Sequence, residues 1–260
     1  MKIFLTFLTL ILFTACDFSS SLHKEIVRAQ KKISQQQYDA AAIIYENILK
    51  KNPSPQLKVK IYYQLGKIYS VNLANGEKAI EFLGLIEKEI EDPLWIVKSK
   101  EEIGEISFSI TKNYSKAIDV YQILASFTPK LSKQDFYQFR LGQSYFQNND
   151  YNNARKIFMG ISNEVSNEYY KDSFYYLGLC SFQEKKWKSA INYWRDYLLR
   201  EDRPDLIIEA KFLMANAYET MEELQMAYDI YYSILGQYPN PEVIKNRLKS
   251  LYARHTARKR

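Results

Sequence analysis

The sequence predicts an all-α protein made of tandem helix-turn-helix units. The first observation is a series of small residues, one in the first helix of each unit. These are Ala29, Gly66, Gly104, Gly142, Gly178 and Ala215, with steps of 37, 38, 38, 36 and 37 residues. The second is a series of alanines, one in each second helix. These are Ala41, Ala79, Ala117, Ala154, Ala190 and Ala227, with steps of 38, 38, 37, 36 and 37 residues. Two series in phase over about six units indicate an internal repeat.

A large side chain stands four residues after each alanine of the second series. The six are Tyr45, Leu83, Tyr121, Phe158, Trp194 and Tyr231. Apolar residues three, four and seven positions apart form the buried stripe of a helix. The small residues allow the two helices of a unit to cross closely. We expect each large side chain to fill the groove against the next unit.

These positions resemble the tetratricopeptide repeat (TPR). The matching motifs are Leu65-Gly66 with Tyr69, Leu141-Gly142 with Tyr145, Leu177-Gly178, Ala215 with Tyr218, and unit-ending prolines at Pro53, Pro129 and Pro239. The resemblance covers roughly residues 22–240 and implies a right-handed TPR solenoid. The steps exceed the usual repeat of about 34 residues, which predicts slightly longer helices or turns.

In chain order, the pattern predicts helices over 22–35, 38–51, 55–71, 77–91, 93–111, 114–127, 131–147, 151–162, 167–183, 187–200, 204–220 and 223–237. Polar residues at helix starts support these limits, as in Asn75-Gly76, Asn113-Tyr114 and Asn149-Asp150. Residues 241–260 are expected to form a capping helix, 241–254, and a basic tail that is frayed from residue 253.

The N-terminus predicts export. Lys2 precedes an apolar run over residues 3–13, which has the length of a signal-peptide core and is short for a membrane span. The following Thr14-Ala15-Cys16 resembles a bacterial lipobox. That resemblance implies a signal peptide over 1–15, acylation (palmitate) of Cys16, and a tether over 16–21. The expected location is the bacterial cell envelope, lipid-anchored and facing the periplasm, with the membrane leaflet open. The alternative is a plain secretory signal.

The composition argues against most chemistry. Cys180 is the only other cysteine, and the two histidines lie at opposite ends of the chain, so no metal site or Ser-His-Asp site is expected. The glycines are scattered rather than gathered into a phosphate-binding loop. The net charge of +6 comes largely from the C-terminus, without a basic stripe, which disfavours nucleic acid as a partner. We therefore expect no cofactor and no enzyme activity.

The resemblance also implies where a partner binds, because the first helices of TPR units line a concave groove. The inward positions lie six and three residues before the small residue, and one and four after it. In the later units these positions include Phe136, Phe139, Phe146, Tyr175, Leu179, Phe182 and Phe212, with Gln143 and Asn216 between them. The earlier units offer His23, Ile26, Lys60, Tyr63, Lys67, Lys98, Glu101, Glu105 and Phe108. The aromatic set predicts a protein or peptide contact. The alternative is that longer helices shift the register and bury these rings in the core.

A lipidated cysteine, a short tether and tandem repeats together resemble the BamD type of outer-membrane assembly lipoprotein. The implied function is a non-enzymatic protein-protein interaction scaffold or adaptor of the envelope. The alternative is an accessory binding subunit for a cell-wall or transport enzyme.

Overall fold

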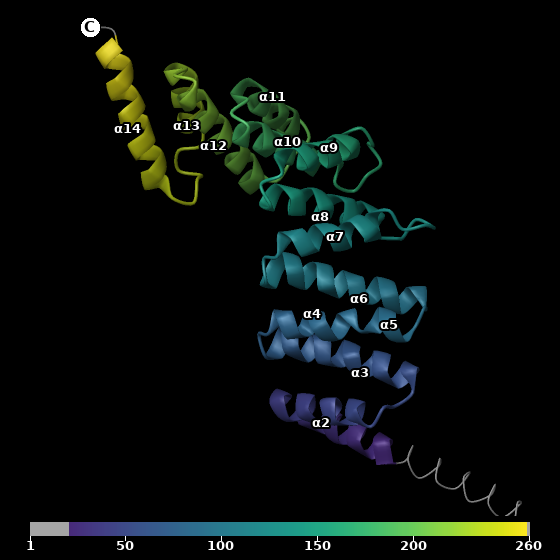
Figure 1. Ribbon diagram of the computed structural model, residues 1–260. Coiled ribbons are helices and arrows are strands. Elements are labelled where there is room, and N and C mark those ends of the chain that lie inside the picture. The colour runs from purple at the N-terminus through teal and green to yellow at the C-terminus, as the bar shows by residue number, and fades with distance from the viewer. Residues whose placement is uncertain (1–20, 259–260) are drawn as a thin grey trace, which may run out of the picture. The chain divides into compact units, whose positions relative to one another are not determined.

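The computed structural model describes residues 21–258, and these are helical with no strand among them. The predicted all-α class is therefore confirmed. The chain divides into two compact units, Met1–Val120 (unit 1) and Tyr121–Arg260 (unit 2) (Figure 1). The predicted signal peptide and Cys16 lie outside the described residues. No helix within residues 21–258 is long and apolar enough to span a membrane.

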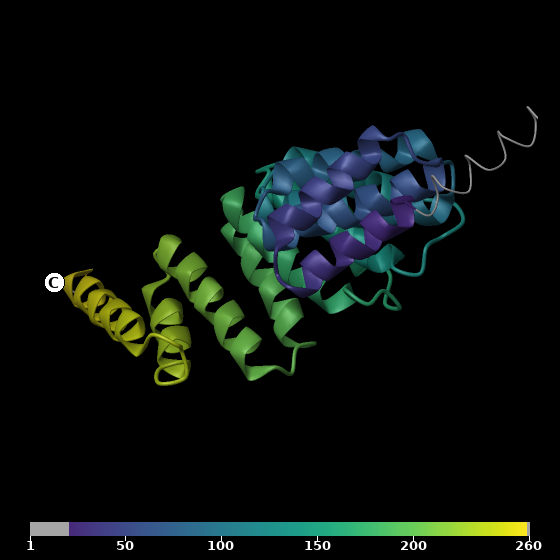
Figure 2. The same ribbon diagram turned by 90° about the horizontal axis from the view of Figure 1, so that it is seen from below.

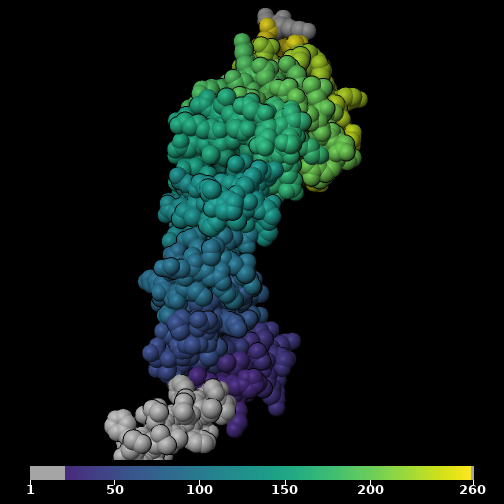
Figure 3. All heavy atoms as spheres, turned by 90° about the vertical axis from the view of Figure 1, so that its right-hand side faces the viewer, coloured from purple at the N-terminus to yellow at the C-terminus, as the bar shows by residue number. Residues whose placement is uncertain are grey.

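Unit 1 is a stack of antiparallel helices taken in chain order. After a helix over residues 21–34, its elements are α2 (Tyr38–Lys50), α3 (Pro55–Lys67), the π-helix η1 (Ile68–Asn72), α4 (Gly76–Gly84), α5 (Ile86–Glu89), α6 (Pro93–Glu105), the π-helix η2 (Ile106–Ile110) and the first part of α7 (Tyr114–Ala125). In the space-filling view, the colours of this unit follow one another in bands (Figure 3). Each layer therefore packs mainly on its sequence neighbours, as in a repeat protein.

Unit 2 contains three helix pairs and a final helix. The pairs are α8 (Gln134–Gln147) with α9 (Tyr151–Ser162), α10 (Tyr170–Gln183) with α11 (Trp187–Leu198), and α12 (Pro204–Thr220) with α13 (Leu224–Ser233); α14 (Pro241–Arg258) follows (Figures 1 and 2). The first helix of each pair will be called an A helix. The bounds of α9 and α12 agree with the predicted ranges.

The final helix caps unit 2 as predicted. Its Ile244, Leu248 and Leu251 are buried in the cluster that contains Tyr231 and Ile234 of the preceding pair. The prediction of a frayed tail from residue 253 was wrong, because α14 continues to Arg258. Ion pairs support this last part, from Arg254 to Glu219 at 2.9 Å and from Arg258 to Glu222 at 2.5 Å.

A left-handed residue marks the turn inside every repeat. The residues with positive φ at these turns are Gln36, Ala74, Lys112, Asn149, Lys185 and Glu222, and each precedes the alanine of its second helix by five residues. The second helix begins two residues after the left-handed residue, and the residue between them stands at the helix start as its cap. At three of these starts a side chain accepts a backbone N–H as predicted, namely Asn75 from Lys78, Asn113 from Lys116 and Asp150 from Asn153.

At two glycines of the first series, a large side chain occupies the space in which a Cβ would lie. A Cβ added to Gly178 would lie 2.6 Å from Cε2 of Trp194, and one added to Gly142 would lie 2.8 Å from the Phe158 ring. Trp194 and Phe158 belong to the second helix of the same unit. The prediction that these side chains fill the groove against the next unit was therefore incomplete, because they first fill the space above their own glycine.

Candidate functional site

The A helices of unit 2 together line a pocket of about 360 Å³, which we call the aromatic pocket. It is lined by Phe139, Gln143, Tyr169, Asp172, Tyr175, Tyr176, Tyr197, Arg203, Leu206 and Glu209. α8, α10 and α12 supply seven of these residues, and the others come from α11 and from the residues just before α10 and α12. One pocket thus collects side chains from three successive helix pairs.

Aromatic rings hold one another in place along the pocket. The Phe139 and Tyr169 rings are stacked with their centroids 4.3 Å apart, and the Tyr176 ring meets Phe139 edge-on at 5.4 Å. Tyr175 contacts both Tyr176, at 5.6 Å, and Tyr197, at 5.4 Å. Edge-to-face and stacked pairs of this kind are favourable beyond the area they bury. The aromatic side chains that line the pocket are therefore held in a network of ring contacts.

A buried carboxylate anchors one end of the aromatic pocket. The Glu201 side chain is fully buried and accepts bonds from Arg203 Nε at 2.8 Å, Arg203 Nη2 at 2.7 Å and the Tyr197 hydroxyl at 2.9 Å. The Arg203 guanidinium holds the pKa of Glu201 well below its usual range. A bidentate pair of this kind fixes the guanidinium in position. The Arg203 guanidinium therefore borders the pocket while two of its nitrogens are bonded to Glu201.

Two further carboxylates border the pocket. Asp172 lies 3.5 Å from Arg203, and burial raises the pKa of Asp172 although Arg203 acts in the opposite direction. Glu209 accepts a hydrogen bond from the Tyr175 hydroxyl at 2.8 Å. Burial, and to a smaller extent Glu209, raises the pKa of Tyr175, so this hydroxyl stays protonated and remains a donor. The pocket thus combines flat rings with carboxylates.

The structure places the seven predicted aromatic and aliphatic candidates in different surroundings. Phe139 and Tyr175 line the aromatic pocket. Phe139 is also a member of a core cluster, being only 8% exposed. Phe182 lines a cavity of about 380 Å³ that ends at α14. The remaining four, Phe136, Phe146, Leu179 and Phe212, are partly buried and pack on neighbouring rings or core residues. Their role in binding stays a prediction.

Sequence reasoning missed most of the polar lining, although a signal was present. Asp172 and Glu209 both lie six residues before the small residue of their unit, at Gly178 and Ala215. This is the position that selected Phe136, so the same rule, applied to charged residues, identifies both carboxylates. Tyr197 and Arg203 lie outside the A helices, where the rule does not apply.

Unit 1 has a pocket of its own on the corresponding face. Its volume is about 390 Å³, and its lining includes four predicted inward positions, Ile26, Lys60, Tyr63 and Lys98. The Lys98 ammonium lies 4.4 Å from the centre of the Tyr63 ring. Lys67, also predicted to face inward, forms an ion pair with Glu102 at 3.1 Å instead of bordering this pocket.

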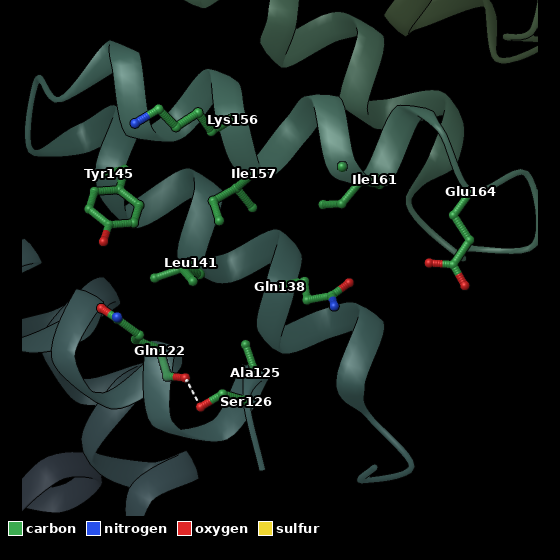
Figure 4. A pocket seen from close by; sticks show the side chains of 11 residues that line it. Gln122, Ala125, Ser126, Gln138, Leu141, Tyr145, Lys156, Ile157, Ile161 and Glu164 are labelled. Atoms are coloured by element: carbon green, nitrogen blue, oxygen red, sulfur yellow. Dashed lines mark hydrogen bonds between the residues drawn. The ribbon is translucent and has the colours of Figure 1, made fainter. Parts of the chain in front are cut away.

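Another pocket, of about 460 Å³, lies between the second helices α7 and α9. Figure 4 shows Leu141, Ile157 and Ile161 with Tyr145 around it and polar side chains at its edge. Its lining comes mainly from second helices, unlike that of the aromatic pocket. Its apolar side chains are accompanied by Gln122, Ser126, Gln138, Lys156 and Glu164.

Nothing in the described part of the chain has the geometry of a metal centre or a reactive thiol. Residues 21–258 contain no group of three or more His, Cys, Asp or Glu side chains placed to hold a metal. Cys180 is buried in the cluster around Phe158 and Ala154, and burial raises the pKa of its thiol to about 12. The thiolate, which is the nucleophile, is therefore scarce near neutral pH.

Comparison with known proteins supports the TPR assignment at the level of fold. Residues 137–165, which contain most of α8 and all of α9, match the tetratricopeptide repeat model. Among curated proteins, no sequence matches this chain.

Solved structures of repeat proteins have similar folds. The apo form of RapI aligns with a TM-score of 0.59 and 13% identity, over 92% of this chain and 87% of that one. PilW, a widely conserved type IV pilus biogenesis factor, gives 0.54 and 13%, over 89% and 98%. The apo quorum sensor NprR from B. thuringiensis gives 0.54 and 18%, over 89% and 68%. At these identities the likeness concerns the fold alone.

Proposed function

We propose that this protein is a non-enzymatic scaffold or adaptor of the bacterial envelope, which binds an extended segment of another protein along the A helices of unit 2. The observation that carries this proposal is the aromatic pocket, because three consecutive A helices contribute to it. Repeat proteins bind extended ligands on surfaces of this kind. A pocket of about 360 Å³ is at the small end of ligand sites, which suits a side chain of a bound peptide.

Anchoring by lipid on Cys16 is part of the proposal. Acyl chains at Cys16 would hold the array at a membrane surface, and within that role we propose outer-membrane protein assembly, the task of the BamD type that the sequence resembles. The variant Cys16→Ala is expected to move the protein from the membrane fraction to the soluble fraction. Retention of the variant in membranes would argue against a lipid anchor.

Photo-crosslinking in native membranes tests the binding surface. A photoreactive residue at Leu206, which lines the aromatic pocket, is expected to capture a partner that mass spectrometry identifies. The matched control is the same residue at Val165, which is 76% exposed in the loop after α9 and lines none of the four pockets described above. Equal capture at both positions would overturn the assignment of the surface. Capture of cell-wall or transport enzymes alone would instead favour the accessory-subunit alternative.

A further inference from the structure

The chemistry of the aromatic pocket selects one kind of side chain. Five aromatic side chains line it, and two carboxylates, Asp172 and Glu209, line it beside them. The electron-rich face of a tyrosine attracts a cation, and a carboxylate beside it adds a charge-assisted hydrogen bond. An anionic or purely aliphatic side chain would leave these groups without a complementary charge.

The one cation in the lining does not satisfy both carboxylates. The Arg203 guanidinium is bonded by two nitrogens to Glu201, at 2.7 and 2.8 Å, and reaches Asp172 only at 3.5 Å. Glu209 accepts a hydrogen bond from the Tyr175 hydroxyl, which is neutral. The lining therefore contains two carboxylates, Asp172 and Glu209, and one guanidinium. That guanidinium is bonded to a third carboxylate, Glu201, which lies outside the lining.

Two further cations, Lys171 and Arg140, lie near the pocket but outside its lining, and Lys171 lowers the pKa of Asp172 to a small extent. Lys171 lies 3.4 Å from Glu201 and 3.6 Å from the exposed Asp202. Arg140 donates to Gln143 at 3.2 Å and lies 5.4 Å from the centre of the Phe136 ring, and it does not line the pocket. Asp172 and Glu209 thus border a space that is also lined by aromatic side chains, and Arg203 is the only cation in that lining.

We propose that the aromatic pocket binds an arginine side chain of the extended partner segment. The planar guanidinium stacks on tyrosine faces and donates in a fork to carboxylates, which fits a pocket that presents both. This inference rests on the proposed scaffold function and specifies the partner as a segment with a positively charged anchor residue.

The test is a comparison of two peptides on the full-length lipoprotein in detergent micelles. The probes are fluorescein-labelled Gly-Ala-Arg-Leu-Gly-Ala and the same peptide with citrulline, which keeps the shape of arginine and lacks its charge. Fluorescence anisotropy is expected to show about five- to tenfold tighter binding of the arginine peptide. The double variant Asp172→Asn/Glu209→Gln is expected to reduce this ratio to about two or less.

A matched variant controls for the loss of two charges. Asp229→Asn/Glu242→Gln removes two exposed carboxylates of the same unit that do not line the pocket, and it should keep the wild-type ratio. Circular dichroism checks that every variant is folded. Equal affinity for the two peptides, an arginine preference that survives in the Asp172/Glu209 variant, or no saturable binding of the arginine peptide would each overturn the proposal.

The two levels of the proposal fail in different ways. If Leu206 captures a partner while the peptides show no preference for arginine, the scaffold function stands and the arginine anchor is wrong. If Leu206 captures nothing above the Val165 control, the proposed function itself fails.

Discussion

A glycine is required at position 178, because the indole of Trp194 occupies the space in which a Cβ would lie. Trp194 is fully buried, and its Nε1 donates to the backbone carbonyl of Tyr175 at 3.1 Å. The indole is therefore fixed both by packing and by a hydrogen bond. Tyr175 in turn lines the aromatic pocket, so the contact that closes the helix pair also supports the A-helix backbone beneath the proposed site.

A double-mutant cycle tests this contact. Gly178→Ala is expected to lower the free energy of unfolding by about 1–3 kcal/mol, because the new methyl group overpacks against the indole. In a Trp194→Ala background the same change is expected to raise it by up to about 1 kcal/mol, since alanine is the better helix former. Urea unfolding of the four proteins gives both values. A similar loss in both backgrounds would show that the indole is not the obstacle.

The buried thiol of Cys180 makes a separate prediction about reactivity. Its pKa of about 12 keeps it neutral at pH 8, whereas an ordinary cysteine has a pKa of about 8.5 and is partly ionised there. In a Cys16→Ser background, labelling by a disulfide reagent is expected to be about a thousandfold slower in the native protein than in guanidinium chloride. The native rate should rise as the pH increases toward 12. Rapid labelling of the native protein at pH 8 would contradict the burial.

At the scale of elements, the two π-helices are explained by residue counts. From the small residue of the first helix to the left-handed turn residue there are eight steps in two units, Gly66 to Ala74 and Gly104 to Lys112. The count is seven in the other four units. A π-helical turn accommodates one residue more than an α-helical turn. η1 and η2 lie in these two longer intervals, so each absorbs one extra residue without moving the turn.

Removing one residue from η1 tests this explanation. Deletion of Val71, which is 68% exposed, reduces the interval from eight to seven and is expected to convert η1 into a regular α-helical turn. The free energy of unfolding should change by about 1 kcal/mol or less, as for a surface change. The matched control is deletion of the exposed Gln183 in α10, where the interval is already seven.

The control deletion should behave differently. Without Gln183 the interval becomes six, a length that no unit of this chain has, and the turn residue Lys185 is displaced from its position. We expect a loss of more than about 3 kcal/mol. Urea unfolding and circular dichroism measure both deletions. Equal losses for the two variants would show that η1 is not an inserted residue.

The elements that sequence reasoning predicted well are those defined by period and by capping chemistry. α9 and α12 were predicted with their observed bounds, because Asp150 and Pro204 are strong helix-start residues. The π-helices were not predicted, because a 3.6-residue period does not distinguish one extra residue from a longer helix. The predicted helix over 77–91 is divided at Leu85 into α4 and α5; Gly84, the last residue of α4, is a local signal for this break that the period alone did not use.

The candidate site was predicted less completely than the fold. The repeat register selects the face, and Phe139 and Tyr175 on that face do line the pocket. Tyr197 and Arg203 come from outside the A helices and join the pocket through contacts with Glu201. These contacts are local, spanning four and two residues, but they lie where α11 leads into α12, outside the A-helix positions that the repeat pattern selects.

For the molecule as a whole, the distribution of charged residues along the chain is a misleading guide to the C-terminus. The basic residues there suggested a cationic tail. In the fold, Arg254 pairs with Glu219 and Glu222, and Arg258 pairs with Glu222. These partners are 32 to 36 residues away in the sequence. Such exposed pairs contribute little individually, yet they neutralise this side of α14 and leave its apolar side for capping.

Truncation after Asn240 tests the cap and how far its effect extends. Loss of α14 removes three buried side chains, Ile244, Leu248 and Leu251, and uncovers Tyr231 and Ile234. Each buried aliphatic side chain contributes about 1.5–3 kcal/mol, so unit 2 is expected to lose several kcal/mol and to bind a hydrophobic dye.

In a repeat protein each layer is stabilised by its neighbours, so the effect of truncation should decrease with distance from α14. Hydrogen exchange is expected to accelerate most in α13 and α12, less in α10 and α11, and not measurably in unit 1. The control is Glu242→Gln, which removes only the exposed pair with Lys245 and should leave exchange unchanged. Uniform acceleration in both units would mean that the chain unfolds as one cooperative body. Unchanged exchange in α13 would mean that α14 is not its cap.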